Sequence, residues 1–302
     1  MSNDATALGY LKSGYLKTYR VSPYESDEIG RLRLGGLLGW FQDSMDVYSS
    51  ALGVGEDYCR KQGISYALRG YDISVDSLPV RGRDVLLHTK LECLTPTSFV
   101  LRQTMHDKSL RASLLSACSR IVLLNEDGHF VRTTENFPEY IQANVPLRSH
   151  FWPNMPVQER VDRTHDEIVP WDYIDFNRHV NNARYVEMAA RGLSPVKLKE
   201  MQLRRIAAIF KQAAKCGEHL QVQTQENPDC SIHRIVSKDK GNSTYADVCF
   251  DWKKKKMLWN EKYRERSLTK PEGSSSKELI VDKESEKKYT LPKPTRRTTY
   301  VY

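Results

Sequence analysis

The residue types best suited to acid–base chemistry occur together in one short segment, Tyr173–Tyr185. Asp175, Asn177 and His179 stand at every second position, so their side chains can point the same way if the segment is extended. A histidine can act as a base near neutral pH, and a nearby carboxylate can fix its tautomer or activate a water molecule. The asparagine amide and the free N–H groups of a following helix can donate to a developing oxyanion. These are the groups that hydrolysis of an acyl thioester requires.

The same segment also fits a structural role. Asn181 or Asn182 can cap the helix that begins there, and His179 can be satisfied by local hydrogen bonds. Spacing alone does not separate the two interpretations, so the elements that would position these residues must be considered.

Those elements follow an order that occurs twice. A strand over residues 15–21 is followed by a loop and then by a helix, because apolar residues recur at helical spacing. Alternation with a period of two follows the helix and predicts antiparallel strands. The order restarts with residues 168–171, a loop, and a helix near Asn181. The helices carry Leu34, Leu37, Leu38, Phe41 and Met45 in the first round and Ala183, Val186 and Ala189 in the second, and the clearest strands are 71–75, 99–102, 112–124, 220–225, 232–236 and 245–250.

A shift of 148 residues superimposes the two rounds. It places Asp27 on Asp175, Arg31 on His179, and the apolar helix positions on one another. A long helix wrapped by an antiparallel sheet, present twice in one chain, predicts an α+β tandem (double) hotdog fold. The predicted divisions are an N-terminal segment 1–13, a first hotdog 14–138, a proline-interrupted linker 139–165, a second hotdog 166–252 and a basic, disordered tail 253–302.

Composition limits the function classes. The chain has 302 residues, of which 39% are hydrophobic, which is enough for two cores. Its net charge of +8 lies in residues 253–302, which contain 15 Lys and Arg against 7 Asp and Glu. The remaining 252 residues have 31 of each sign, so the body of the chain does not resemble a nucleic-acid-binding domain. The tail is too polar to bury a core, and a basic arm that binds an acidic surface is the alternative.

The cysteines and the hydropathy pattern predict a cytoplasmic protein. No run approaches the roughly 18 apolar residues of a membrane span, and residues 1–13 contain no secretory h-region. The six cysteines show no C-x-x-C pair, so free thiols are expected, with Cys216 as a buried structural thiol. The other histidines lack metal-ligand spacing, and neither a metal nor an organic cofactor is implied.

The stretch D-F-N-R-H-V-N-N-A-R-Y, residues 175–185, resembles the signature of the plant and bacterial acyl-acyl-carrier-protein (acyl-ACP) thioesterases. The first half resembles the same family through residues 24–32 and the helix containing Phe41-Gln42-Asp43, and the resemblance extends from about residue 14 to 250. It implies that Asp175, Asn177 and His179 are catalytic and that the first hotdog shapes the acyl pocket. Ile29 and Arg31 replace the Asn and His there, so one site per chain is expected.

One position departs from the family pattern. A glutamate is usual in the strand after the second helix, and Ala213 stands there in this chain. Three explanations remain open: Asp175 and His179 act without it, Glu187 or Glu218 replaces it, or the protein is a slow or lapsed enzyme.

The resemblance predicts hydrolysis of fatty acyl-ACP to free fatty acid and ACP, which would end or divert fatty acid synthesis. The partner would be an acyl carrier protein bearing a phosphopantetheine-linked acyl chain, and a homodimer is possible from the sequence. An acyl-CoA thioesterase and a lapsed acyl-binding module are the alternatives.

Overall fold

The computed structural model describes residues 2–109, 112–148 and 153–255, which lie in one compact unit. Its elements form two rounds, each with a strand, a turn, a long helix, a short helix and four strands. The first round comprises β1 (Tyr15–Arg20), α2 (Leu34–Ala51), α3 (Glu56–Gln62), β2 (Ile64–Val75), β3 (Asp84–Thr95), β4 (Ser98–Asp107) and β5 (Ser113–Asn125). The second comprises β6 (Arg163–Ile168), α6 (Asn182–Arg191), α7 (Pro195–Glu200), β7 (Met201–Phe210), β8 (His219–Glu226), β9 (Cys230–Ser237) and β10 (Thr244–Lys254). The other helices are α1 (Ser2–Ser13), α4 (Thr133–Asn136), α5 (Glu139–Asn144) and the 3₁₀ turn Trp171–Tyr173.

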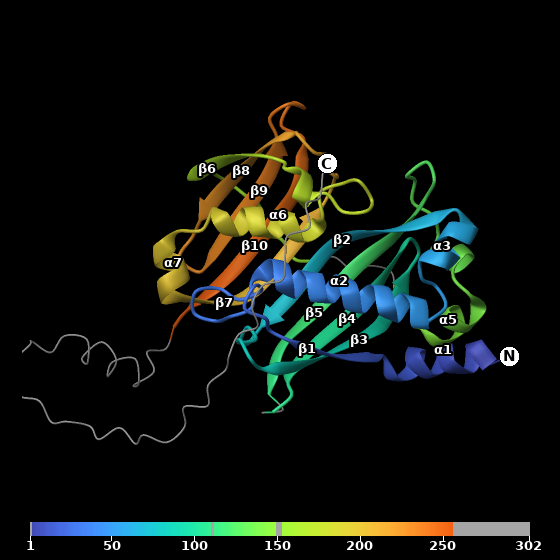
Figure 1. The fold of residues 1–302 in the computed structure, drawn as a ribbon. Helices are drawn as coiled ribbons and strands as arrows, with labels where there is room; N and C mark the ends of the chain where they lie inside the picture. Colours follow the sequence, from blue (N-terminus) through green and yellow to red (C-terminus); the bar gives the residue numbers. More distant parts are fainter. Residues whose placement is uncertain (1, 110–111, 149–152, 256–302) are drawn as a thin grey trace, which may run out of the picture. The chain divides into compact units, whose positions relative to one another are not determined.

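The ten strands form one antiparallel sheet in the order β1-β3-β4-β5-β2-β7-β10-β9-β8-β6 (Figure 1). Reading inward from each edge gives the same order of equivalent strands, so the two rounds are related by a pseudo-two-fold axis between β2 and β7. These two strands pair from Gly70 with Ile209 to Ser74 with Arg205. The predicted tandem hotdog is confirmed.

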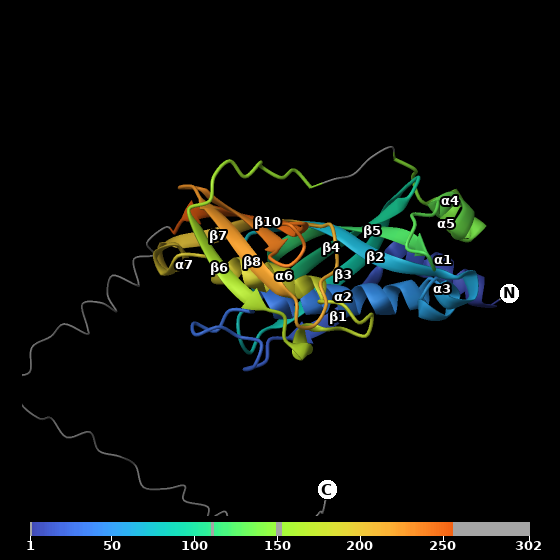
Figure 2. The same ribbon diagram turned by 90° about the horizontal axis from the view of Figure 1, so that it is seen from above.

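Both long helices lie on the same face of the sheet, side by side (Figures 1 and 2). Their apolar stripes are buried in one core that contains residues of both halves. Aromatic rings pack in a row across the junction. The ring centre of Tyr71 lies 6.1 Å from that of Phe41 and 6.2 Å from that of Phe210. The ring centre of Phe210 in turn lies 6.1 Å from that of Tyr185. Burial of this apolar surface stabilises the packing of the two hotdogs against each other.

Several elements differ from the sequence expectation. Helix α1 was not predicted, because it buries little more than Ala7 and Leu11 and has no apolar stripe. Helix α5 occupies the start of the predicted linker, and β6 begins at Arg163, before its end. Lys253 and Lys254 belong to β10 rather than to the tail, because backbone pairing with Gln202 and Met201 does not depend on side-chain charge. The rest of the predicted tail, 256–302, lies outside the described residues.

Candidate active site

The predicted catalytic residues lie on a tight turn between Ile174 and Val180, which form an isolated antiparallel bridge. The N–H of Asp175 donates to the carbonyl of His179 at 2.9 Å, so the backbones of these two residues lie opposite each other at the base of the turn. Asn177 is exposed at the tip, where its N–H donates to Asp175 Oδ1 at 2.9 Å. The expectation of an extended segment was wrong, because these local bonds and the left-handed φ of 62° at Arg178 close the chain into a turn.

The first half contains the equivalent turn, 148 residues earlier. Asp27 N–H donates to the Arg31 carbonyl at 2.7 Å, and Ile29 N–H donates to Asp27 Oδ1 at 3.1 Å. Gly30 takes the left-handed position with a φ of 81°. The predicted repeat therefore extends to individual hydrogen bonds. The side chains of the two turns differ, because in the first turn Arg31 Nε forms an ion pair with Asp27 Oδ2 at 2.9 Å.

In the second turn the polar side chains are less engaged. Among the described residues, the side chains of Asn177 and His179 make no hydrogen bond, and Asp175 Oδ2 receives one from Asn181 Nδ2 at 3.5 Å. A carboxylate, an imidazole and an amide are thus available to a bound molecule within one turn.

Asn181 caps helix α6, as the structural interpretation predicted. Its Oδ1 accepts from the N–H of Ala183 at 2.9 Å, and its own carbonyl accepts from Arg184 N–H at 2.9 Å. These two helical N–H groups are therefore not available to an oxyanion. Asn182 does not cap the helix, but donates to the carbonyl of Leu68 on β2 at 3.2 Å. The start of α6 is thereby attached to the first half.

The segment with the missing carboxylate lies beside the turn. The N–H of Val180 donates to the carbonyl of Ala214 at 2.9 Å, which places Ala213 next to this pair. Ala213 is exposed and outside the strand, because Lys211 and Gln212 both donate to the carbonyl of Tyr245 and end the β7 ladder. The expectation that this position lies within a strand was wrong.

The two predicted substitutes for that carboxylate are engaged elsewhere. Glu187 forms an ion pair with Arg184 at 2.8 Å and lies against α2, where a Cβ built on Gly35 would be 1.9 Å from its Oε1. Glu218 accepts from Lys240 Nζ at 2.6 Å and from the hydroxyl of Tyr245. Burial alone would raise the pKa of Glu218, but these two hydrogen bonds hold it below its usual value.

The first half contributes a residue that the spacing of the turn did not indicate. Gln42 of α2 exchanges two amide hydrogen bonds with Asn181: its Nε2 donates to Oδ1 at 3.2 Å, and its Oε1 accepts from Nδ2 at 3.0 Å. The available signal was a polar amide beside Phe41 on the inward side of an apolar helix. A sequence separation of 139 residues concealed its partner.

The thiols take no part in the turn. All six cysteines are free, as predicted, but Cys216 is exposed rather than buried. It lies in the turn Lys215–Glu218, where Gly217 has a φ of 83° and projects the chain to the surface. The inference that this thiol is structural and buried was wrong.

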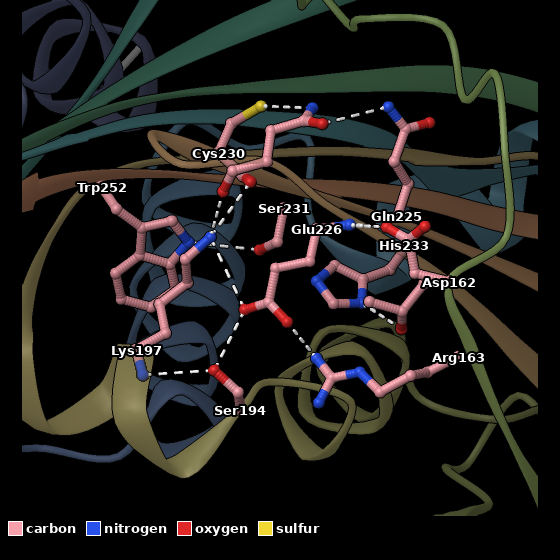
Figure 3. A network of polar contacts seen from close by, with 12 residues as sticks. Asp162, Arg163, Ser194, Lys197, Gln225, Glu226, Cys230, Ser231, His233 and Trp252 are labelled. Atoms are coloured by element: carbon pink, nitrogen blue, oxygen red, sulfur yellow. Dashed lines mark hydrogen bonds and ion pairs between the residues drawn. The ribbon is translucent and has the colours of Figure 1, made fainter.

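A second polar cluster lies at the opposite end of α6, on β6, β8, β9 and α7 (Figure 3). The buried Lys197 Nζ donates to the carbonyls of Asn227 at 2.5 Å and Cys230 at 3.2 Å, and lies 3.6 Å from Glu226 Oε1. Glu226 also pairs with Arg163. Each charged side chain named in this cluster is engaged with another protein group, so the cluster offers no free reactive group.

The fused hotdogs and the polar turn ahead of the second helix place the chain among double-hotdog proteins. Residues 158–254 match the family model described as the acyl-ACP thioesterase C-terminal domain. This match confirms the predicted family resemblance over the second half of the chain and includes the whole candidate turn. A search of curated proteins found no match.

Solved structures agree on the fold. A putative oleoyl thioesterase from Lactobacillus plantarum is 20% identical with a TM-score of 0.69, covering 80% of this chain and 96% of that one. An acyl-ACP thioesterase from Bacteroides thetaiotaomicron is 16% identical with a TM-score of 0.70, covering 80% and 98%. The 12:0-ACP thioesterase from Umbellularia californica is 14% identical with a TM-score of 0.68, covering 80% and 97%.

Two features are absent from the described residues. None of their helices is both long and apolar enough to cross a membrane. They contain no group of three or more His, Cys, Asp or Glu residues arranged to hold a metal ion.

Proposed function

We propose that this protein hydrolyses fatty acyl-ACP thioesters to free fatty acid and ACP in the cytoplasm, as a step that ends or diverts fatty acid synthesis. The observation that carries the proposal is the turn that places Asp175, Asn177 and His179 together, with Asp175 and His179 joined by a backbone hydrogen bond, within the segment that matches the acyl-ACP thioesterase C-terminal domain. Six free cysteines are typical of a reducing compartment.

In the proposed reaction, Asp175 and His179 activate a water molecule. The water oxygen forms a bond to the acyl carbonyl carbon, and its proton passes to this pair. Asn177 donates a hydrogen bond to the oxyanion that develops on the carbonyl oxygen. The C–S bond then breaks, the proton returns to the departing thiolate of the phosphopantetheine arm, and the carboxylic acid is released.

The turn of the first half is proposed to have no catalytic role. Arg31 stands in the place of His179 and neutralises Asp27, so this turn has neither an imidazole nor an available carboxylate. One active site per chain follows.

The test compares hydrolysis of matched acyl-ACP and acyl-CoA substrates over a series of chain lengths. His179→Ala, Asp175→Asn and Asn177→Ala should each lower kcat by about 100-fold or more. Arg31→Ala, at the equivalent position of the first turn, is the matched control and should retain kcat. Full activity in folded His179→Ala would contradict the proposal, and faster turnover of acyl-CoA would reassign the substrate.

A lapsed acyl-binding module is the second candidate, and the absence of a carboxylate at Ala213 favours it. Acyl-ACP binding without turnover in the wild-type protein would support this alternative.

A further inference from the structure

Asn181 joins the candidate turn to the helix of the other hotdog. Its amide orientation is decided by the cap, because Oδ1 must accept from the N–H of Ala183. Nδ2 therefore donates, and its two acceptors are Gln42 Oε1 at 3.0 Å and Asp175 Oδ2 at 3.5 Å. The longer contact is at the outer limit of a hydrogen bond, and such contacts often tighten when substrate binds.

Gln42 is itself held by the core of the first half. It lies on α2 beside the fully buried Phe41, and its side chain lies near the hydroxyl of Tyr71, which is 1% exposed. A phenol is already neutral at physiological pH, and burial raises the pKa of Tyr71 further. The amide pair thus links Asp175 to a rigid part of the other hotdog.

The pseudo-symmetry of the fold supplies an internal comparison. The shift of 148 residues that relates the two turns assigns Arg33 to the position of Asn181 and Ala190 to that of Gln42. Arg33 occupies the N-cap position of α2, but its side chain forms no capping hydrogen bond. Ala190 has no side-chain amide that could replace that of Gln42. The linkage between helix and turn therefore exists only at the turn with the acid–base residues. If this linkage were needed only for folding, we would expect both halves to contain it.

We propose that Gln42 is a positioning residue of the second-half site, acting through Asn181 to hold the carboxylate of Asp175 in its reactive orientation. This inference rests on the proposed function. Gln42 does not touch the reacting atoms. It contributes by fixing the geometry of a group that does, and a small displacement of such a group lowers the rate of the chemical step more than it lowers substrate binding.

The experiment is a double-mutant cycle on the full chain with acyl-ACP as substrate. Gln42→Leu removes the amide at similar size, and Asn181→Ser retains a cap acceptor while removing Nδ2. Each single variant should lower kcat by about tenfold with KM changed by less than about twofold. Because both break the same linkage, the double variant should be no slower than either single one. Asp46→Ala, an exposed change one turn further along α2, is the control and should retain kcat.

Wild-type kcat in Gln42→Leu would overturn the inference. So would losses that multiply in the double variant, or a fall in the melting temperature that accounts for the lost rate. Asp175→Asn is measured in parallel to separate the two proposals. Full activity in this variant refutes the assignment of the site itself, whereas a large loss in it together with a neutral Gln42→Leu refutes only the positioning role.

Discussion

The buried histidine of the second hotdog allows a quantitative prediction about stability. His233 on β9 is completely buried under the end of α6, where its Nδ1 lies 3.0 Å from Thr224 Oγ1. Its Nε2 has no hydrogen-bond partner among the described residues. Burial, together with the nearby Arg163, His165 and Lys197, lowers the pKa of His233 from 6.5 to about 3. The imidazole is therefore neutral in the folded protein.

The sign of the effect follows from proton binding. Below pH 6.5 the unfolded chain binds a proton at this residue and the folded chain does not, until the pH approaches 3. Stability is complete above pH 6.5 and is lost as the pH falls through this window. Between pH 7 and pH 5 the loss from one such group is about 2 kcal/mol. For a unit of this size, that corresponds to a decrease in melting temperature of about 4–8 °C.

The assay is thermal or urea unfolding from pH 7.5 to 5, above the ordinary pKa values of Asp and Glu. His233→Gln should flatten the dependence on pH, whatever its effect on absolute stability. His219→Gln, at an exposed histidine on the neighbouring strand β8, is the control and should keep the wild-type slope. Burial also lowers the pKa of His165, so a residual slope should disappear when His165 is replaced as well. An unchanged slope in His233→Gln would refute the argument.

Four further outcomes are expected. Gly39→Ala should stabilise α2 by about 1 kcal/mol, because nothing lies within 4 Å of the new Cβ. Gly35→Ala should stabilise the helix less, because Glu187 must move to make room for the new Cβ. Equal melting temperatures of the two variants would contradict this packing. Ala213→Glu should raise kcat without loss of stability, since the position is exposed and beside the turn, and an unchanged kcat would show that Asp175 and His179 need no second carboxylate. Asp27→Asn should lower stability, measured by urea unfolding, and leave kcat unchanged, and loss of turnover at full stability would contradict a single site. Truncation after residue 255 should leave the melting temperature almost unchanged, because the ten-stranded sheet is complete without the remainder, and a large fall would show otherwise.

Local sequence patterns were sufficient for the repeated architecture. Helical and strand periodicities reflect which side of an element is buried, so they predicted α2, α6 and most strands. They did not reveal β7, whose partly buried first half contains the polar residues Gln202, Arg204 and Arg205, although its second half is buried. The shift of 148 residues placed Asp27 on Asp175, and the structure shows that both residues begin equivalent turns, because such turns are closed by hydrogen bonds within five residues.

What the sequence by itself determined is therefore local: the two hotdog rounds, the loop with Asp175, Asn177 and His179 ahead of the second helix, and the pair of asparagines that includes the cap. Tertiary structure decided what lies next to that turn. The register of β7 and β10 ends the ladder at Phe210 and brings Ala214 to Val180, while the antiparallel packing of α6 on α2 brings Gln42 to Asn181 and directs Glu187 to Gly35. Spacing along the chain specifies backbone geometry over a few residues. Neighbours separated by more than a hundred residues depend on the packing of whole helices and the register of whole strands, which no single segment encodes.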